Sequence, residues 1–362
     1  MRASVCRAVG KIGIEQLDEP KPGPGEVRLR MVAAGVCRTD LSIYQGHLPV
    51  PMPIVLGHEG AGVVEEVGPD VRGLAVGDSV VCSIIAGCGV CFQCLREASS
   101  LCEDVTFYTG KMLDGTTRLS RGDEDIHSLA FQGAFAEQAI VPERCAVRVS
   151  KDAPLADVAG LACGVATGLG AAMVRAPVEP GEIICVIGAG GVGLSTLMGA
   201  RLRGAAELIA VDIVPKKLAH AEALGLASTL IDARDGAVSD AILSATRGRG
   251  ADVVYDAVGS TQTVLQALDG VRAGGRVVII GIADALVEVP LQTRHLLRQK
   301  TVTGTMGGSI QPHRHIPEFV DLHLSGRLDL GQLMDRDYAL DEVDRAFADL
   351  EAGQITRGLV RL

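Results

Sequence analysis

A glycine-rich turn between a buried strand and an apolar helix is the feature that most limits the fold. The strand-like run Ile183–Ile187 is wholly apolar apart from one cysteine, and an apolar helix follows the turn. The turn itself consists of Gly188, Ala189, Gly190, Gly191, Val192 and Gly193. Such a turn brings backbone N–H groups and a helix N-terminus against a pyrophosphate. Alone the motif is weak, because a glycine-rich turn can also serve only close packing.

The surrounding pattern strengthens this interpretation. From about Leu161 the runs IICVIG, ELIAVD, DVVYDAVG and GRVVIIG suit buried strands, and LSTLMGARLRG and KKLAHAEALG suit helices between them. This alternation is typical of a doubly wound parallel sheet. We therefore predict an α/β fold with a Rossmann dinucleotide-binding domain over residues 161–305.

The end of the second strand predicts the cofactor. ELIAVD ends at Asp212, whose carboxylate can accept hydrogen bonds from the adenosine ribose hydroxyls. Its charge would repel a 2′-phosphate, and Ile213 and Val214 supply no arginine to bind one, so NAD is favoured over NADP. Lys217 can add a ribose contact. The alternatives are a helix cap or solvated loop for Asp212 and an ordinary surface position for Lys217.

The rest of the chain has a different texture. Up to about Ser150, short β-rich runs such as EVRLRMVAAG, GAGVVEEVG, DSVVCSII and FAEQAIV alternate with Gly and Pro. This pattern predicts a mostly β domain. After about Met306, HIPEFVDLHLSG and LDEVDRAFADLEAG predict helices.

Charge and hydropathy exclude some classes of function. The net charge of -10 argues against nucleic-acid binding, because phosphate recognition normally requires a basic excess. No uncharged apolar run has membrane-spanning length and no signal peptide is apparent, so we expect a cytoplasmic protein without a membrane partner. In that reducing compartment, the ten cysteines are expected to be metal ligands or core residues rather than disulfides.

Four cysteines are closely spaced in GCGVCFQCLREASSLC. They are separated by two, two and seven residues and are Cys88, Cys91, Cys94 and Cys102. Four thiolates this close can complete a tetrahedral shell around zinc with no open position, which predicts a structural site. An iron–sulfur cluster uses similar spacings, but nothing in the sequence argues for the electron-transfer partners it needs.

A second set of possible ligands is dispersed. It comprises Cys37 in GVCRTD, His58 and Glu59 in LGHEGAG, and Cys163 in LACGVATG. A catalytic zinc takes about three protein ligands and keeps an exchangeable position, and two cysteines with one histidine is a known solution. Taken singly, each residue can also be explained as a small core residue or a hydrogen-bonded buried histidine.

The whole chain resembles the zinc-containing medium-chain alcohol dehydrogenases, including their class III and bacterial nicotinoprotein branches. GHEGAGVVEEVG is similar to the family's zinc signature, the four-cysteine lobe has the family's spacing, and GAGGVG is similar to its cofactor turn. The resemblance implies a GroES-like catalytic domain, formed by residues 1–160 and 306–362, around the Rossmann domain. It also implies two zinc ions per chain, NAD, and a homodimer or homotetramer.

The resemblance assigns roles residue by residue. It implies Cys37, His58 and Cys163 as catalytic zinc ligands, with Glu59 beside the metal and able to bind it transiently. Asp40 matches a carboxylate that orients the zinc histidine. Further matches are Arg38 and Arg357 to arginines that meet the cofactor pyrophosphate, although either can be a surface arginine, and Thr167 to a residue beside the nicotinamide.

The expected reaction is hydride transfer between a primary alcohol or its aldehyde and NAD, because zinc as a Lewis acid lowers the pKa of an alcohol. Thr39 matches the family hydroxyl that accepts the proton and passes it through the cofactor ribose. Many relatives end this relay on a histidine at the position of Ser42, which cannot be a terminal base. Either His47, water or another group finishes the relay, or proton release is slower.

Two positions bear on the substrate. Leu48 and Ile84 match residues that wall the substrate pocket with apolar surface, which favours apolar or aromatic alcohols, although both can simply fill the core. One alternative is a nicotinoprotein that keeps NAD(H) bound. A glutathione-dependent formaldehyde dehydrogenase is disfavoured, because that branch holds its anionic adduct with polar and charged residues around the pocket entrance, and Gly46 and Leu48 stand in the matching loop here. A non-catalytic family member is disfavoured, because no zinc ligand is lost.

The remaining cysteines and most histidines match no ligand position. We expect Cys6, Cys82, Cys145 and Cys185 to fill the core. Surface or capping positions are expected for His127, His220, His295, His313, His315 and His323.

Overall fold

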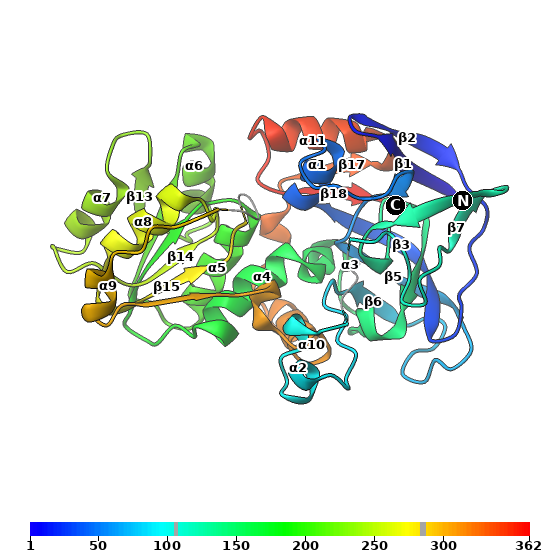
Figure 1. The fold of residues 1–362 in the computed structure, drawn as a ribbon, viewed down its shortest axis with the longest axis horizontal. Helices are drawn as coiled ribbons and strands as arrows, with labels where there is room; N and C mark the ends of the chain where they lie inside the picture. The colour runs from blue at the N-terminus through cyan, green and yellow to red at the C-terminus, as the bar shows by residue number, and fades with distance from the viewer. Residues whose placement is uncertain (105–107, 283–286) are drawn as a thin grey trace. The chain divides into compact units, whose positions relative to one another are not determined.

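The computed structural model describes residues 1–104, 108–282 and 287–362, which form two compact units (Figure 1). Unit 1 comprises Met1–Gly164 and Gln311–Leu362, and unit 2 comprises Val165–Ile310. The units divide after residues 164 and 310, where the sequence suggested 160 and 305. No single helix in the described ranges is long and apolar enough to cross a membrane. Two consecutive helical segments, Leu155–Ala162 and Gly164–Arg175, reach that length and hydropathy only when they are taken together, and they are bent by 69° at the break between them.

Unit 1 is built on two sheets. The larger has the order β10-β6-β5-β3-β18-β17, with β9 also paired to β3, and the smaller has the order β2-β1-β4-β8-β7. The strands of the larger sheet are β3 (Glu26–Val36), β5 (Gly60–Val67), β6 (Ser79–Cys82), β9 (Gln138–Pro142), β10 (Ala146–Arg148), β17 (Arg336–Ala339) and β18 (Gly358–Arg361). Those of the smaller sheet are β1 (Arg2–Ala8), β2 (Lys11–Gln16), β4 (Ile54–Val55), β7 (Leu119–Arg121) and β8 (Glu124–Ser128).

Short helices connect most of these strands, and two longer helices lie before β17 and between β17 and β18. The α-helices are α1 (Arg38–Tyr44), α2 (Phe92–Leu95), α3 (Leu155–Val158), α10 (Pro312–Leu324) and α11 (Val343–Glu351). The 3-10 turns are η1 (Ser99–Leu101), η2 (Leu129–Phe131), η3 (Glu143–Cys145), η4 (Ala159–Ala162), η7 (Gly331–Leu333) and η8 (Leu340–Glu342). The amphipathic α11 buries Phe347 in the same core as Leu29 and Met31 of β3. The predicted β-rich runs and helical tail are therefore confirmed.

Unit 2 is a doubly wound sheet of six parallel strands in the order β13-β12-β11-β14-β15-β16 (Figure 1). The strands are β11 (Ile183–Ile187), β12 (Glu207–Asp212), β13 (Thr229–Asp232), β14 (Ala251–Asp256), β15 (Val271–Ile279) and β16 (Thr301–Gly304). The helices are α4 (Gly164–Gly170), which starts at the last residue of the first part of unit 1, η5 (Ala171–Arg175), α5 (Gly191–Leu202), α6 (Pro215–Ala223), α7 (Val238–Ala245), α8 (Thr261–Gly270), α9 (Thr293–Leu297) and η6 (Gly307–Ser309). This order reverses between β11 and β14 and is that of a Rossmann fold, as predicted.

The four cysteines without a predicted ligand role are free and buried, as expected for core residues: Cys6, Cys82, Cys145 and Cys185. Two of the six histidines expected at surface or capping positions are buried. His315, 8% exposed, still caps a helix, because its Nδ1 accepts from the backbone N–H of Gln311, the residue before α10. The prediction was wrong for His295. His295 on α9 is only 5% exposed, with its Nε2 3.6 Å from a carboxylate oxygen of Asp269. The polar neighbours in TRHLLRQK gave no sign that this face of the short helix turns inward.

Candidate active site

Strand pairing in unit 1 gathers three residues that are far apart in the sequence. Cys37 follows β3 directly and is the residue that precedes α1. Glu59 precedes β5 and Arg357 precedes β18, and both strands pair with β3, through Ala34–Gly60 and Val36–Gly358. The three side chains therefore start from the same end of three adjacent strands.

A possible metal site forms at this end of the sheet. The ligand atoms of Cys37, His58, Glu59 and Cys163 all lie within 4.8 Å of one another. Cys163 reaches this position from the segment between η4 and α4. Two sulfurs and one imidazole nitrogen make up a donor set of a catalytic zinc, and three ligands leave a position for substrate. The residues present therefore fit a catalytic zinc ion.

Asp40 fixes the orientation of the candidate histidine ligand. It lies fully buried in α1, and its Oδ1 accepts hydrogen bonds from the backbone N–H of Gly57 at 2.9 Å and from His58 Nδ1 at 3.0 Å. This contact commits Nδ1 and leaves Nε2 as the nitrogen for a metal. Burial lowers the pKa of His58, but the charges of Asp40 and Cys37 outweigh that effect and hold it well above its ordinary value.

The two candidate cysteine ligands interact with each other. A hydrogen bond from the thiol of Cys163 and the charge of His58 hold the pKa of Cys37 well below its ordinary value, against the effect of burial. Zinc binds the thiolate form of cysteine. The surroundings of Cys37 thus favour the form that a metal requires.

Glu59 forms a buried ion pair with Arg357. Its Oε1 accepts hydrogen bonds from Arg357 Nη2 and from the backbone N–H of Gly164, both at 3.0 Å, and its Oε2 accepts from Arg357 Nη1. Both side chains are almost fully buried. A Cβ on Gly35 would collide with this carboxylate, and one on Gly164 would collide with the guanidinium. Burial raises the pKa of Glu59 to about 7, although Arg357 opposes the rise.

This placement bears on the predicted roles of the arginines. Arg357 is not a surface arginine, because it is 3% exposed and its guanidinium is held on Glu59. Arg38 is exposed in the first turn of α1. A pyrophosphate contact by either residue stays a prediction.

The four-cysteine lobe fits a structural zinc. The four Sγ atoms lie within 4.8 Å of one another, with 4.0 Å between Cys88 and Cys94 and between Cys91 and Cys102. A tetrahedral shell with Zn–S bonds of about 2.3 Å places sulfurs about 3.8 Å apart, whereas a disulfide requires about 2.05 Å. Backbone N–H groups of Glu103 and Cys94 lower the pKa of Cys91 to about 6. The donor set and its spacing are those of a closed zinc site.

The glycine-rich turn of unit 2 fits a dinucleotide. Gly188 adopts a left-handed φ of 95°, and a Cβ on Gly193 would collide with the carbonyl oxygen of Gly188, so the tight turn requires both glycines. A Cβ on Gly190 would project into open space. Gly191 and Val192 begin α5, whose first backbone N–H groups are available to an anion.

Asp212 stands at the end of β12, beside this turn. Its Oδ2 accepts a hydrogen bond from the backbone N–H of Ala189 at 2.8 Å, and its Oδ1 accepts from Val214 at 2.9 Å. It is thus neither solvated nor merely a cap, and each oxygen retains capacity for a further donor. Ile213 is 64% exposed and Lys217 lies half-buried on α6. Thr167 lies on α4 in the same unit, and its predicted place beside the nicotinamide is untested.

The residues expected in the proton relay and in the substrate pocket all belong to unit 1, and in the sequence each lies close to a candidate metal ligand. Thr39 is half-buried on α1, Ser42 lies one turn further on, and His47 is exposed after the helix. Leu48 and Ile84 are partly buried and pack against the core of unit 1. Both therefore fill core in part, and their predicted contact with substrate is not tested.

Tyr108 is a site residue that the sequence did not suggest. Partial burial raises the pKa of its hydroxyl; the charge of His58 opposes the rise and those of Cys163 and Cys37 add to it, so Tyr108, which is 44% exposed, lies within electrostatic range of the candidate metal ligands. A single aromatic residue in an irregular loop has no periodicity or motif that could have identified it.

A GroES-like β unit with two possible zinc sites and a Rossmann unit together define a zinc-dependent dehydrogenase. Comparison with known proteins agrees with this class. Residues 23–151 match the alcohol dehydrogenase GroES-like domain, and residues 191–325 match the zinc-binding dehydrogenase model.

Several relatives extend over the whole chain. It is 37% identical to an NDMA-dependent alcohol dehydrogenase of Amycolatopsis methanolica, over 99% of this chain and 98% of the relative. It is 33% identical to an alcohol dehydrogenase class-3 of Myxine glutinosa, over 97% and 94%. The crystal structure of benzyl alcohol dehydrogenase from Acinetobacter calcoaceticus has a TM-score of 0.94 at 33% identity and covers 100% of this chain and 99% of its own.

The chain therefore belongs to the zinc-containing medium-chain alcohol dehydrogenases. It is an oxidoreductase that acts on alcohols, with zinc and NAD as cofactors.

Proposed function

We propose that this enzyme transfers hydride between apolar or aromatic primary alcohols, or their aldehydes, and NAD at a zinc ion held by Cys37, His58 and Cys163. The main support is the convergence of four possible ligand atoms within 4.8 Å in a largely buried site. Zinc would supply the Lewis acidity that lowers the pKa of the alcohol, and NAD would accept the hydride.

The other residues of the site orient ligands and move a proton. Asp40 holds the imidazole of His58 through Nδ1. Glu59, positioned by Arg357 and the N–H of Gly164, offers a carboxylate that can approach the metal transiently. The hydroxyl of Thr39 accepts the alcohol proton, and a group other than Ser42 completes its release to water.

The proposed preference for apolar substrates rests on Leu48 and Ile84. Burial of apolar ligand surface against them would contribute about 25 cal/mol per Å2. Similarity to a benzyl alcohol dehydrogenase supports aromatic alcohols in particular. Neither residue offers a charge to the carboxylates of a glutathione adduct.

Side-by-side kinetics test this function. We expect kcat/KM for benzyl alcohol to exceed that for ethanol, and both to exceed that for S-hydroxymethylglutathione, with NADH formation as the readout. A preference for the glutathione adduct would overturn the substrate assignment and leave the zinc chemistry intact.

Retention of NAD is a second candidate property, favoured by the similarity to an NDMA-dependent alcohol dehydrogenase. Such an enzyme would keep NAD bound and reoxidise NADH in place with a second substrate or external acceptor. Enzyme purified without nucleotide should then release NAD on denaturation and oxidise alcohol with NDMA alone. An enzyme free of nucleotide that requires added NAD would rule this out.

We further propose a homodimer or homotetramer in the cytoplasm. β16 is the last strand of the described sheet, and Leu296 and Leu297 just before it are exposed, a combination that favours association with another copy. The ten cysteines all lie in the described ranges and none forms a disulfide, which suits a reducing compartment. Light scattering on the purified protein gives the oligomeric state directly.

A further inference from the structure

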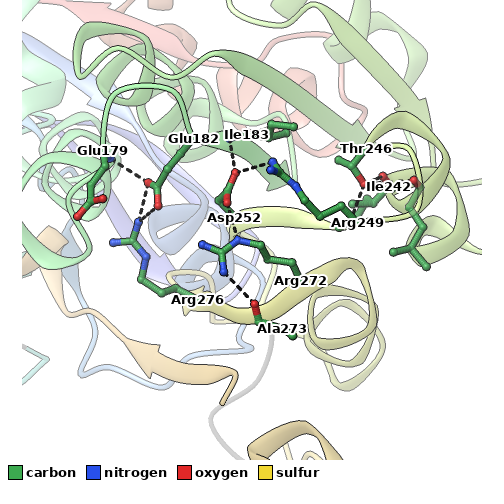
Figure 2. Close-up of polar contacts among 12 residues, drawn as sticks. Glu179, Glu182, Ile183, Ile242, Thr246, Arg249, Asp252, Arg272, Ala273 and Arg276 are labelled. Atoms are coloured by element: carbon green, nitrogen blue, oxygen red, sulfur yellow. Dashed lines mark hydrogen bonds and ion pairs between the residues drawn. The ribbon is translucent and has the colours of Figure 1, made fainter. Parts of the chain in front are cut away.

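Strand β14 carries two buried aspartates, one near each end, with different surroundings. Near the amino end, Asp252 accepts from the backbone N–H of Ile183 at 2.8 Å and pairs with Arg272 at 2.5 Å and Arg249 at 3.1 Å (Figure 2). These contacts join the starts of β11, β14 and β15 and have the character of a structural brace. Asp256, at the carboxyl end, is fully buried.

Asp256 holds the turn that follows it. Its Oδ1 accepts hydrogen bonds from the backbone N–H groups of Val258 at 2.9 Å and Gly259 at 3.1 Å. Its Oδ2 accepts from the hydroxyl of Thr263 at 2.8 Å, in the first turn of α8. One carboxylate thus fixes both the turn between β14 and α8 and the start of that helix.

This turn is packed against two neighbouring loops at the same edge of the sheet. The N–H of Ala257 donates to the carbonyl oxygen of Ile187 at 2.8 Å, and the N–H of Gly281 donates to that of Asp256 at 3.0 Å. A Cβ on Gly188 would lie 2.9 Å from the side chain of Val258. The turn after β14 therefore adjoins the turn expected to hold the pyrophosphate.

The strand order shows which half of the cofactor would meet this turn. β12, β11 and β14 are consecutive in the sheet. When the adenosine ribose of a dinucleotide binds at Asp212, after β12, and its pyrophosphate binds the turn after β11, the nicotinamide half extends over the end of β14. Val258, which is 38% exposed, stands there.

We propose that Asp256 is a positioning residue for the nicotinamide half of NAD, acting through the Val258–Gly259 turn that its carboxylate holds. The proposal rests on NAD binding at the Gly188–Gly193 turn. Substitution of Asp256 should free the turn and weaken contacts with the nicotinamide mononucleotide half, while the adenosine and pyrophosphate contacts remain.

The test compares NAD with ADP, which lacks the nicotinamide half. We would measure both dissociation constants by titration calorimetry on zinc-loaded protein freed of nucleotide. Asp256→Asn places an NH2 group where a carboxylate oxygen accepted, so we expect NAD to bind about tenfold more weakly while ADP binding stays within about twofold. Asp252→Asn is the matched control on the same strand, and it should lower Tm without changing either constant.

Two further variants keep the test decisive. Asp212→Ala should weaken both ligands, which checks the cofactor site itself. If Asp256→Asn does not fold, Thr263→Val removes one of the three hydrogen bonds and should weaken NAD selectively, whereas Thr263→Ser should restore binding.

Several outcomes would overturn the proposal. If Asp256→Asn or Thr263→Val folds and binds NAD as the wild type does, while Asp212→Ala weakens binding of both ligands, only the positioning role of Asp256 is refuted. Equal weakening of NAD and ADP by Asp256→Asn refutes it too, because the turn would then not be specific for the nicotinamide half. No effect of Asp212→Ala on either ligand would refute the underlying cofactor site.

Discussion

Removal of Arg357 should destabilise the enzyme far more than removal of an exposed arginine four residues away. Arg357 is 3% exposed and pairs with the fully buried Glu59. Removal of one partner of such a pair leaves an uncompensated buried charge and costs about 3–5 kcal/mol. We therefore expect Arg357→Met to lose about that much unfolding free energy.

Arg361 is the matched control, because it lies on the adjoining strand β18 and pairs with Asp337 at 2.9 Å while both side chains are about half exposed. An exposed pair contributes about 0–1 kcal/mol, so Arg361→Met should change stability little. The double variant Arg357→Met with Glu59→Gln should recover much of the loss. Arg357 Nε is buried without a hydrogen-bond partner in the described ranges, so the contacts of the ion pair do not fully offset the free energy lost when the two charged groups leave water.

Urea unfolding of the zinc-loaded proteins, followed by circular dichroism and zinc content, measures these effects. Because the two units can unfold separately, the transition of unit 1 is the relevant one. A loss below about 1 kcal/mol for Arg357→Met, or a double variant as unstable as the single one, would show that the pair is not the compensated buried charge described here.

Three other predictions concern metal and cofactor. First, elemental analysis should find two zinc ions per chain, and the two sites should differ in role. Cys163→Ser should lose activity while staying folded, whereas Cys94→Ser should mainly lose stability, because a closed zinc site contributes folding energy. Similar losses in both variants would contradict this division. Asp40→Asn should weaken zinc binding at the catalytic site about 10–100-fold, measured by competition with a chelator, because it alters the partner of His58 Nδ1; unchanged affinity would remove that role. Asp212→Gly with Ile213→Arg should shift preference from NAD toward NADP, and a wild-type enzyme that already prefers NADP would contradict our interpretation of this strand end.

The Rossmann unit was largely predictable because its inner strands have a strong local signal. β11, β12 and β14 are apolar runs that are buried on both faces. β13 and β16 were missed, since TLID and TVTG are four residues long and mostly half-exposed or exposed. Such outer strands depend on pairing with a neighbour more than on their own hydropathy.

The two zinc sites differ in the same way. The closed site is local: its four cysteines lie within fifteen residues, 88–102, so spacing alone predicts it. The catalytic set spans β3, β5 and the segment before α4, and only long-range strand pairing brings it together. Resemblance to a family, rather than spacing, was therefore needed to group Cys37, His58 and Cys163.

The Glu59–Arg357 pair shows what neither spacing nor the resemblance provided. Arg357 is separated from Glu59 by 298 positions and reaches it because β18 adds to β3 beside β5. The approach also requires the absence of two Cβ atoms, at Gly35 and Gly164. Each glycine lies beside a candidate zinc cysteine, Gly35 in GVCRTD and Gly164 in LACGVATG, but the close contact that requires it is made with a residue distant in the sequence. A buried charge pair of this kind is specified jointly by strand order and by small residues on adjoining segments, and a pattern read along one segment cannot reveal it.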